Sequence, residues 1–394
     1  MSTHKQLVFP KVEAKFSGRF PQGHINSLKG WDYSHDELKA ASKGGRMLTM
    51  DLDMFGEFSC RAKCRHCFEK KLFAIRKKKG LLLSDDQVKS VLREGAGLGL
   101  RSVKIIGPGE PIESKSLFEC LELLKSLDIQ AMIFTKGTAI GDDSISMDAL
   151  GMDSAELIRR LDSLGVSIAL GSNSFEPQTQ EDIVRLSGYP SIRNRAIERL
   201  VDAGFTKFNI GEPTRLGIIM NPIVRENHDE IFELYEWARM RHIYVITSPT
   251  MVSGPCSKES EYRKMTPEAD TLLDLYVKIN LWAIERGIYS LEDLERVGVS
   301  AYAGAKPCQQ VGAGLFIRRD GLALRCPGDD TSIQGNLHER SLAEIWRNSE
   351  NLNRYGGMIN VGCPPKEGKS MPDGFLKQVA EEIKRRLADG ETKK

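Results

Sequence analysis

The sequence has no long apolar run and no secretory signal pattern. Nothing in its 394 residues approaches the roughly 18 consecutive apolar residues that a membrane-spanning helix needs. The N-terminus lacks the basic and then apolar order of a signal peptide. The net charge is only +2, so overall charge indicates no particular partner. These absences predict a cytoplasmic protein with no membrane partner.

Eight cysteines are present, and their clustering decides how they are interpreted. In a reducing cytosol, closely spaced cysteines more often bind metal than form disulfides. Cys60, Cys64 and Cys67 have the spacing C-x3-C-x2-C. A 4Fe–4S cluster normally takes four thiolates, so three leave one iron open to chelate a cofactor through an amine and a carboxylate. The alternative is a zinc site, which needs a fourth ligand, and His66 lies inside the triplet.

Strand-like and helix-like segments alternate from residue 47 to about residue 250. The alternation predicts a parallel sheet, with functional groups at the C-terminal ends of its strands. Ser84 and Gln87 form a capping box at the start of one helix, and Asn227 is expected to cap another. Periodicity alone leaves open a partial barrel and a doubly wound sheet. The six segments that have the pattern of strands are 47–53, 102–106, 131–135, 166–170, 215–220 and 243–247.

The cysteine spacing, followed by the aromatic Phe68, resembles the signature of the radical S-adenosylmethionine (SAM) superfamily. Directly after the second strand, residues 107–111 (GPGEP) resemble that family's Gly-Gly-Glu-Pro motif, with Pro108 in place of the second glycine. The resemblance implies an α/β fold, a partial (β/α)6 TIM-type barrel, and a 4Fe–4S cluster that binds SAM. It also implies reductive cleavage of SAM to a 5′-deoxyadenosyl radical, which removes a hydrogen atom from an organic substrate.

The same resemblance implies contacts to SAM beyond the cluster. Glu110 would accept a hydrogen bond from the SAM ammonium group, and Gly107 and Gly109 would let the backbone approach closely. Polar residues around the fourth and fifth strands would meet the carboxylate, ribose or adenosine. Ordinary barrel-end structure is the alternative for each of these residues, which are Ser172, Asn173, Arg215 and Asn221.

A second cysteine set lies near the C-terminus. Cys308 and Cys326 flank a predicted hairpin with strands at 315–318 and 322–325, and Cys363 follows a predicted capped helix. This order resembles the C-terminal SPASM or twitch domains of the superfamily, which bind an auxiliary 4Fe–4S cluster. The resemblance therefore implies two clusters in total.

The fourth ligand of the auxiliary cluster is left open by the sequence. Lys366 stands where the full SPASM pattern has a further cysteine, so a second auxiliary cluster is not expected. Cys256 is one candidate ligand; a non-cysteine group, or substrate on an open iron, is the alternative. Cys120 has apolar neighbours at helical spacing and is predicted to be a core residue.

Five parts of the chain are predicted. The last, a charged amphipathic helix, is expected on the solvated surface. In order they are an N-terminal extension (1–45), the radical SAM partial barrel (46–250), a helical connector (251–299), a small irregular C-terminal iron–sulfur domain (300–370) and a C-terminal helix (371–394).

The expected function is that of a radical SAM oxidoreductase or lyase-type enzyme acting on a small metabolite such as a sugar. No separate leader-peptide-binding domain is evident in the short N-terminal extension, which is why a small molecule is preferred. The alternatives are a maturase of a ribosomally made peptide or protein, an RNA-modifying enzyme, and a non-enzymatic iron–sulfur scaffold or regulator.

The expected partner is an electron donor of the flavodoxin or ferredoxin type. A basic run over residues 61–79 would attract such an acidic donor, a phosphate or a nucleic acid, or it is simply solvated surface. Aromatic side chains suitable for base stacking do not interleave with it, so a nucleic-acid partner is not expected.

Overall fold

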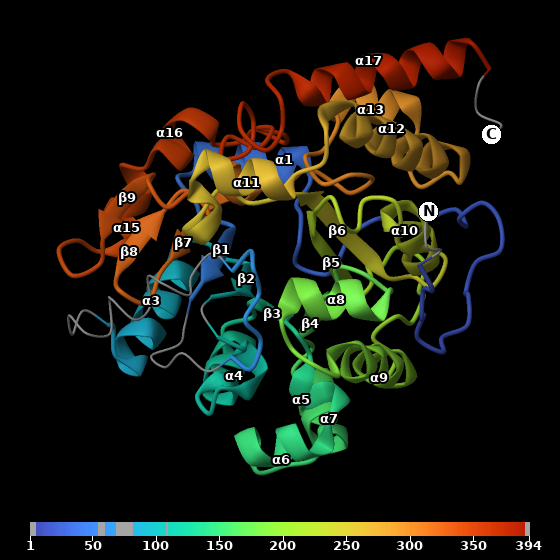
Figure 1. The fold of residues 1–394 in the computed structure, drawn as a ribbon. Helices are drawn as coiled ribbons and strands as arrows, with labels where there is room; N and C mark the ends of the chain where they lie inside the picture. The colour runs from blue at the N-terminus through green and yellow to red at the C-terminus, as the bar shows by residue number, and fades with distance from the viewer. Residues whose placement is uncertain (1–4, 54–59, 68–81, 108, 391–394) are drawn as a thin grey trace.

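The computed structural model describes residues 5–53, 60–67, 82–107 and 109–390. Within these residues the strands form a single sheet in the order β6-β5-β4-β3-β2-β1-β7-β8-β9 (Figure 1). All neighbours from β6 to β7 are parallel, and β8 and β9 are antiparallel to their neighbours. The strands are β1 (Thr49–Leu52), β2 (Ser102–Ile105), β3 (Gln130–Thr135), β4 (Ser167–Gly171), β5 (Leu216–Ile223), β6 (Tyr244–Pro249), β7 (Gly314–Ile317), β8 (Leu322–Leu324) and β9 (Ile333–Asn336).

Helices connect the parallel strands and cover their outer side (Figure 1). The helices up to β6 are α1 (His35–Lys43), α3 (Asp85–Gly97), the 3-10 helix η1 (Pro111–Glu113), α4 (Leu117–Ser126), α5 (Thr138–Gly141), α6 (Asp143–Leu150), α7 (Ser154–Ser163), α8 (Pro177–Val184), α9 (Tyr189–Asp202) and α10 (Ile231–Arg239). Those after β6 are η2 (Gly254–Ser257), α11 (Glu259–Met265), α12 (Ala269–Glu285), α13 (Leu291–Val297), α14 (Gln310–Ala313), α15 (Leu342–Arg347), α16 (Glu350–Tyr355) and α17 (Phe375–Ala388).

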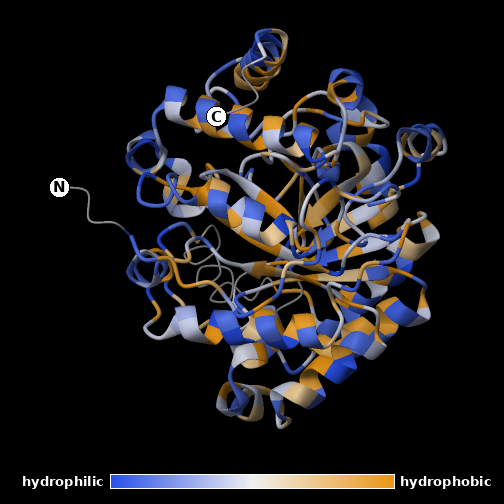
Figure 2. Ribbon diagram, turned by 90° about the vertical axis from the view of Figure 1, so that its right-hand side faces the viewer, coloured by the Kyte–Doolittle hydropathy of each residue, from blue (hydrophilic) through white to orange (hydrophobic). Residues whose placement is uncertain are grey.

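Alternation along the strands separates two cores, because successive side chains of a strand point to opposite faces. Met50 and Leu52 of β1 face outward and join the main core beneath the helices. The alternate residues of β1, Thr49 and Asp51, point the other way and face the concave interior of the sheet. Figure 2 shows the consequence: the central strands are hydrophobic, and the covering helices alternate hydrophobic and hydrophilic segments.

The N-terminal extension closes the N-terminal end of this interior. Leu28 is fully buried and pairs as an isolated bridge with Thr214. Trp31 packs with Tyr244 of β6 and with Phe134 of β3. The extension therefore forms the base of the space that the strands enclose.

The predicted fold class is confirmed. The sheet is a curved, mostly parallel α/β sheet that does not close into a full barrel, since β6 and β9 stand at opposite ends of the strand order. The capping box at Ser84 and Gln87 is present at α3, and Cys120 is buried in the main core as expected. None of the described helices is long and apolar enough to cross a membrane.

Three local features differ from the expectations. Asn227 does not cap α10, because the N-cap of that helix is Glu230. The Asn227 side chain instead accepts from the Val224 N–H and donates to the Asn173 carbonyl. Helix α17 is not merely a solvated element, because its apolar face packs against α12 (Figure 1). The predicted hairpin, β7 and β8, does not stand apart: β7 pairs with β1 and extends the main sheet. The five-part division remains a prediction.

Candidate active site

The first cysteine loop lies at the C-terminal end of the sheet and is fastened to its rim. The Lys63 N–H donates to the Val184 carbonyl at 2.9 Å, and the Arg65 N–H donates to the Ile183 carbonyl at 3.2 Å. The Arg65 guanidinium pairs with Glu226 at 2.9 Å. These contacts hold Cys60, Cys64 and Cys67 on one side of a shared cavity. Phe68 lies outside the described residues.

The turn at residues 107–111 requires its glycines. Gly107 and Gly109 have φ of 141° and 100°, which side chains other than glycine rarely adopt. A Cβ on Gly107 would also lie 2.7 Å from the Asp53 Oδ1. The turn therefore leads directly from β2 into the site, and it positions Glu110.

Glu110 is buried and faces the cavity. Its carboxylate accepts from the Lys136 N–H at 2.7 Å and from the Thr135 hydroxyl. Burial raises its pKa to about 7, and the nearby Glu113 carboxylate adds to the increase. The carboxylate is thus held in one orientation and, when ionised, suits a cationic ligand.

Lys136 follows β3 and brings positive charge to the first cysteine loop. A Cβ on Gly171 would lie 2.9 Å from its Nζ, so the glycine leaves room for the ammonium group. Burial lowers the pKa of Lys136, but Cys64, Tyr189 and Cys60 together raise it above its ordinary value. A lysine at this point stabilises thiolates, which a bound cluster requires.

His66 lines the cavity, and within the described residues its Nδ1 has no hydrogen-bond partner. Burial lowers its pKa to about 3, with Lys136 and Arg65 contributing. The imidazole is therefore neutral and part of the cluster's surroundings.

The other residues assigned to SAM have different surroundings. Asn221 lines the cavity beside Gly171. Ser172 and Asn173 are fully buried but do not line it; Ser172 accepts from Arg193 at 2.6 Å, and Asn173 donates to the Asn221 carbonyl at 2.9 Å. Both residues therefore lie behind the cavity wall, where their hydrogen bonds hold it in place.

The prediction that Arg215 contacts SAM is wrong, because the residue lies at the other end of its strand. The residue precedes β5, so it lies at the N-terminal end of the strand, opposite the cysteines. Its guanidinium pairs with Asp162 and stacks on Phe205, 4.4 Å from the ring centroid. Arg215 is a surface contact between β5 and α7, not a cofactor contact.

The second cysteine set comes from three separate segments. Cys308 precedes α14, Cys326 follows β8, and Cys363 lies after α16. Burial raises the pKa of all three thiols, to about 11 for Cys363, and the charges of Cys308 and Cys363 contribute to the shift at Cys326. The three thiols therefore influence one another electrostatically, as ligands of one cluster would.

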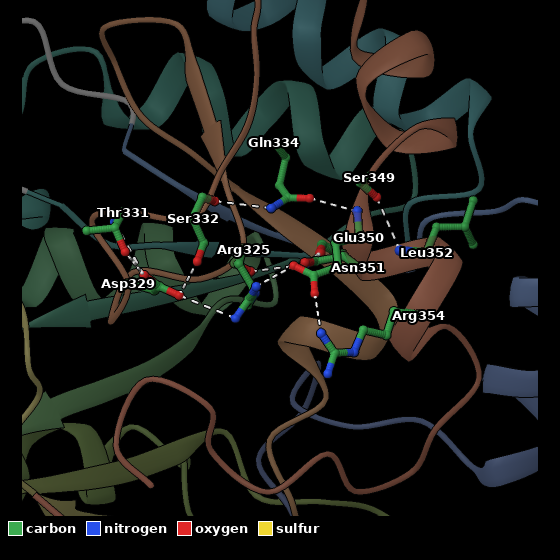
Figure 3. A network of polar contacts seen from close by, with 11 residues as sticks. Arg325, Asp329, Thr331, Ser332, Gln334, Ser349, Glu350, Asn351, Leu352 and Arg354 are labelled. Carbon is green, nitrogen blue, oxygen red and sulfur yellow. Dashed lines mark hydrogen bonds and ion pairs between the residues drawn. The ribbon is translucent and has the colours of Figure 1, made fainter. Parts of the chain in front are cut away.

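A polar network fixes the segment that carries Cys326 (Figure 3). The guanidinium of Arg325 pairs with Glu350 at the start of α16 and with Asp329 at 3.5 Å. The Asn351 side chain donates to the Arg325 carbonyl at 3.0 Å. The Glu350 N–H donates to Gln334 at 2.8 Å. These contacts tie the end of β8 to α16 and leave Cys326 facing the cavity.

Lys366, which stands in place of an expected cysteine, faces the second cysteine set. It is 3% exposed, donates to the Ser248 hydroxyl, and its Nζ lies 5.5 Å from the centroid of the Tyr302 ring. Burial lowers its pKa, and the charges of the three cysteines oppose that decrease. The Lys366 amine therefore interacts electrostatically with all three cysteines of the second set.

Cys256 is not with the second set. Its Sγ lies 3.8 Å from the Met265 Sδ, and the charged groups that act on its thiol are Glu261 and Arg65. It is also absent from the cavity wall. This location favours the version of the auxiliary site in which Cys256 is not a ligand.

One cavity of about 280 Å³ joins the two cysteine sets. Its wall includes all six cysteines of the two sets, and also Gly107, Gly109 and Glu110. Within the described residues, no three His, Cys, Asp or Glu side chains are placed to hold one metal ion. In a 4Fe–4S cluster each thiolate binds a different iron, so its ligands are spread more widely than those of a single ion. Two spread sets of thiols with nearby lysines fit two clusters.

The deep end of the cavity contains polar residues that sequence patterns did not single out. Asp51 of β1 and Lys104 of β2 are neighbours in register, and Gln310 begins α14. All three are buried and line the cavity. The sequence does contain a signal for these residues: one aspartate and one lysine interrupt strands whose other residues are mostly apolar, and charged residues in buried strands often have a functional role.

Comparison with known proteins places this geometry in a family. Residues 58–238 match the model of the Radical SAM superfamily. The chain carries a radical SAM domain. The predicted radical SAM domain and its cofactors, SAM and 4Fe–4S clusters, are thereby confirmed, whereas the individual ligands and SAM contacts remain predictions.

Curated proteins similar to this chain include several named as PqqA peptide cyclases. The radical SAM chain is 21% identical over 293 residues to the PqqA peptide cyclase of Xanthomonas oryzae pv. oryzae (strain MAFF 311018), covering 71% of each chain. It is 24% identical over 297 residues to the PqqA peptide cyclase of Xanthomonas euvesicatoria pv. vesicatoria (strain 85-10), again with 71% of each chain covered.

Solved structures agree on the fold. Streptococcus suis SuiB bound to its precursor peptide SuiA aligns with a TM-score of 0.53 and 15% identity, covering 87% of this chain and 79% of that chain. Streptococcus suis SuiB in a second crystal structure aligns with a TM-score of 0.51 and 14% identity, covering 86% of this chain and 80% of that chain.

Proposed function

We propose that this radical SAM enzyme modifies a peptide, and that the alternative of a peptide maturase replaces the expectation of a sugar substrate. The observation that carries the proposal is the single cavity lined by both cysteine sets. A substrate held there would meet the radical source on one side and an auxiliary cluster on the other. The curated relatives, which are named as peptide cyclases, support a peptide rather than a small metabolite.

In this proposal Cys60, Cys64 and Cys67 hold the SAM-binding cluster, and Cys308, Cys326 and Cys363 hold the auxiliary cluster. The bound cluster and SAM supply the 5′-deoxyadenosyl radical, with an electron from a flavodoxin- or ferredoxin-type donor. Glu110 orients the SAM ammonium group, and Lys136 stabilises the thiolates.

The test uses the full chain reconstituted anaerobically with iron and sulfide. Short peptides encoded beside the gene are supplied in perdeuterated form with SAM and dithionite. The expected result is deuterium in 5′-deoxyadenosine together with a mass change in one peptide. Deuterium transfer from perdeuterated monosaccharides, with every peptide unchanged, would contradict the peptide assignment while leaving the radical chemistry intact.

A further inference from the structure

The polar floor of the cavity, defined as Asp51, Lys104 and Gln310, has a fixed geometry. The Lys104 Nζ lies 3.2 Å from the Gln310 Oε1 and 3.6 Å from the Asp51 Oδ1. It also lies 5.2 Å from the centroid of the Trp31 ring, which forms the base below it. One ammonium group therefore holds both the carboxylate and the amide in place.

Two polar atoms of the floor make no hydrogen bond in the described part of the structure. Among the described residues, neither the Asp51 Oδ1 nor the Gln310 Nε2 has a hydrogen-bond partner. The 3.6 Å contact between Lys104 and Asp51 is an ion pair too long to be a hydrogen bond. The orientation of Gln310 is settled by Lys104, because an ammonium group only donates and so must face the amide oxygen. The amide nitrogen of Gln310 is then left as a donor.

Buried polar atoms in folded proteins almost always have partners, so this pair indicates a ligand. One atom accepts and the other donates. Asp51 and Lys104 carry opposite charges, so the pair next to these two atoms has no net charge. A neutral group that both donates and accepts fits such a site better than an anion or a cation, since either ion would leave one charge of the pair opposed.

We propose that Asp51 and Gln310 bind a carboxamide of the substrate, either a backbone peptide group or an Asn or Gln side chain. The substrate N–H donates to the Asp51 Oδ1, and the substrate carbonyl accepts from the Gln310 Nε2. This contact sets which substrate residue lies between the two cysteine sets. The inference rests on the proposed function in that the carboxamide belongs to a peptide, and it assigns the recognition to three named residues.

The experiment measures binding of three probes of similar size to the anaerobically reconstituted full chain at pH 8. The probes are N-methylacetamide, which is a neutral carboxamide, propionate, which is an anion without an amide, and diethylammonium, which is a cation without an amide. Dissociation constants come from saturation-transfer NMR titrations. The neutral probe is expected to bind at least about fivefold more tightly than either of the others.

Matched variants locate the effect. Gln310→Leu should weaken the neutral probe about tenfold. Gln309→Leu is the control, because Gln309 is similarly buried but its amide oxygen and nitrogen both bond to the Tyr33 backbone, at 2.7 Å and 2.9 Å. It should leave probe binding unchanged. Lys104→Gln leaves Asp51 without its counter-charge and should shift the preference toward the diethylammonium cation.

Iron content and far-ultraviolet circular dichroism identify any variant that fails to fold. A Gln310→Leu variant that keeps its iron and binds the neutral probe as the wild type does would overturn the carboxamide site. Equal affinity of the wild type for all three probes would overturn it as well. Neither outcome changes the formation of 5′-deoxyadenosine or the peptide mass, which test the proposed function separately.

Discussion

The two cysteine sets are built in opposite ways. Cys60, Cys64 and Cys67 belong to one eight-residue loop at the rim of the sheet, held by backbone hydrogen bonds and surface ion pairs. Cys308, Cys326 and Cys363 come from three segments and meet only when β7, β8 and α16 are in place. The difference indicates that the first site is a local structure, whereas the second is a product of the folded C-terminal region.

Removing each set separately should give the largest effects. The triple variant Cys60→Ala, Cys64→Ala, Cys67→Ala should lose about four of an expected eight irons and reduce SAM cleavage to background. The triple variant Cys308→Ala, Cys326→Ala, Cys363→Ala should also lose about four irons but retain uncoupled SAM cleavage. Iron analysis and chromatography of 5′-deoxyadenosine measure both. SAM cleavage that survives in the first variant would refute the assignment.

Glu110→Gln keeps the shape of the side chain but removes the charge. The SAM dissociation constant should increase roughly 10- to 100-fold, since a charge-assisted hydrogen bond contributes about 1.5–3 kcal/mol. Glu230→Gln is the control, because Glu230 is also buried but accepts from the Ser174 hydroxyl at 2.6 Å and lies outside the cavity wall. Equilibrium dialysis with labelled SAM gives both constants. Equal effects of the two variants would make Glu110 a structural residue of the turn.

A pH dependence follows from the raised pKa of Glu110, about 7. Because the ionised carboxylate binds the SAM ammonium, SAM affinity of the wild type should increase as the pH rises from 6 to 8. The sign for stability is opposite: a carboxyl pKa raised by folding stabilises the protein at low pH, and this contribution is lost as the pH rises through 7. Dialysis of Glu110→Gln over the same range should show a flat profile, and an unchanged slope would exclude Glu110 as its source.

Loss of the auxiliary cluster should destabilise the protein more than loss of the cluster held by the first cysteine loop. A cross-link across long segments restricts the unfolded chain more than one within a short loop. The second triple variant should therefore melt roughly 5–10 °C below the wild type, and the first only a few degrees below, given about 2–4 °C per kcal/mol for large domains. Differential scanning calorimetry under anaerobic conditions compares them. Equal shifts would break the distinction between a local and an assembled site.

Lys366→Met should lower the reduction potential of the auxiliary cluster, because a positive charge near a cluster favours the added electron. At a separation of roughly 6 Å and an effective dielectric constant of about 20, the interaction is about 3 kcal/mol, or on the order of 100 mV. Lys366→Arg should retain most of the wild-type value. Redox titration followed by electron paramagnetic resonance measures the shift; identical potentials in all three proteins would place the ammonium too far from the cluster to matter.

The smallest effect is expected for Cys256→Ala. Its thiol contacts Met265 instead of the second cysteine set, so iron content and the auxiliary resonance signal should not change. Loss of about four irons would make Cys256 the fourth ligand and show that the segment after β6 moves when the cluster binds.

Local patterns predicted the parts of the molecule that local chemistry determines. The six barrel strands follow from apolar segments, and the glycine turn with Glu110 follows from a motif attached to one strand. The pairing of β7 with β1 could not be predicted in this way, because it joins residues far apart in the sequence. Arg215 was misplaced although the strand direction already put it at the N-terminal end. Asp51 and Lys104 were overlooked because charged residues inside buried strands were treated as part of the strand pattern.

The pairing of β7 with β1 also has a consequence during synthesis. Thr49 and its partner Gly314 lie about 265 residues apart. At a translation rate of roughly 5–20 residues per second, β1 waits about 13–50 seconds on the ribosome before its second neighbour exists. During that interval one side of β1 is an open edge strand, with unpaired N–H and C=O groups that can join another chain. Nascent chains of this protein are therefore exposed to aggregation until about the final fifth is made, and a truncation ahead of β7 would make that exposure permanent.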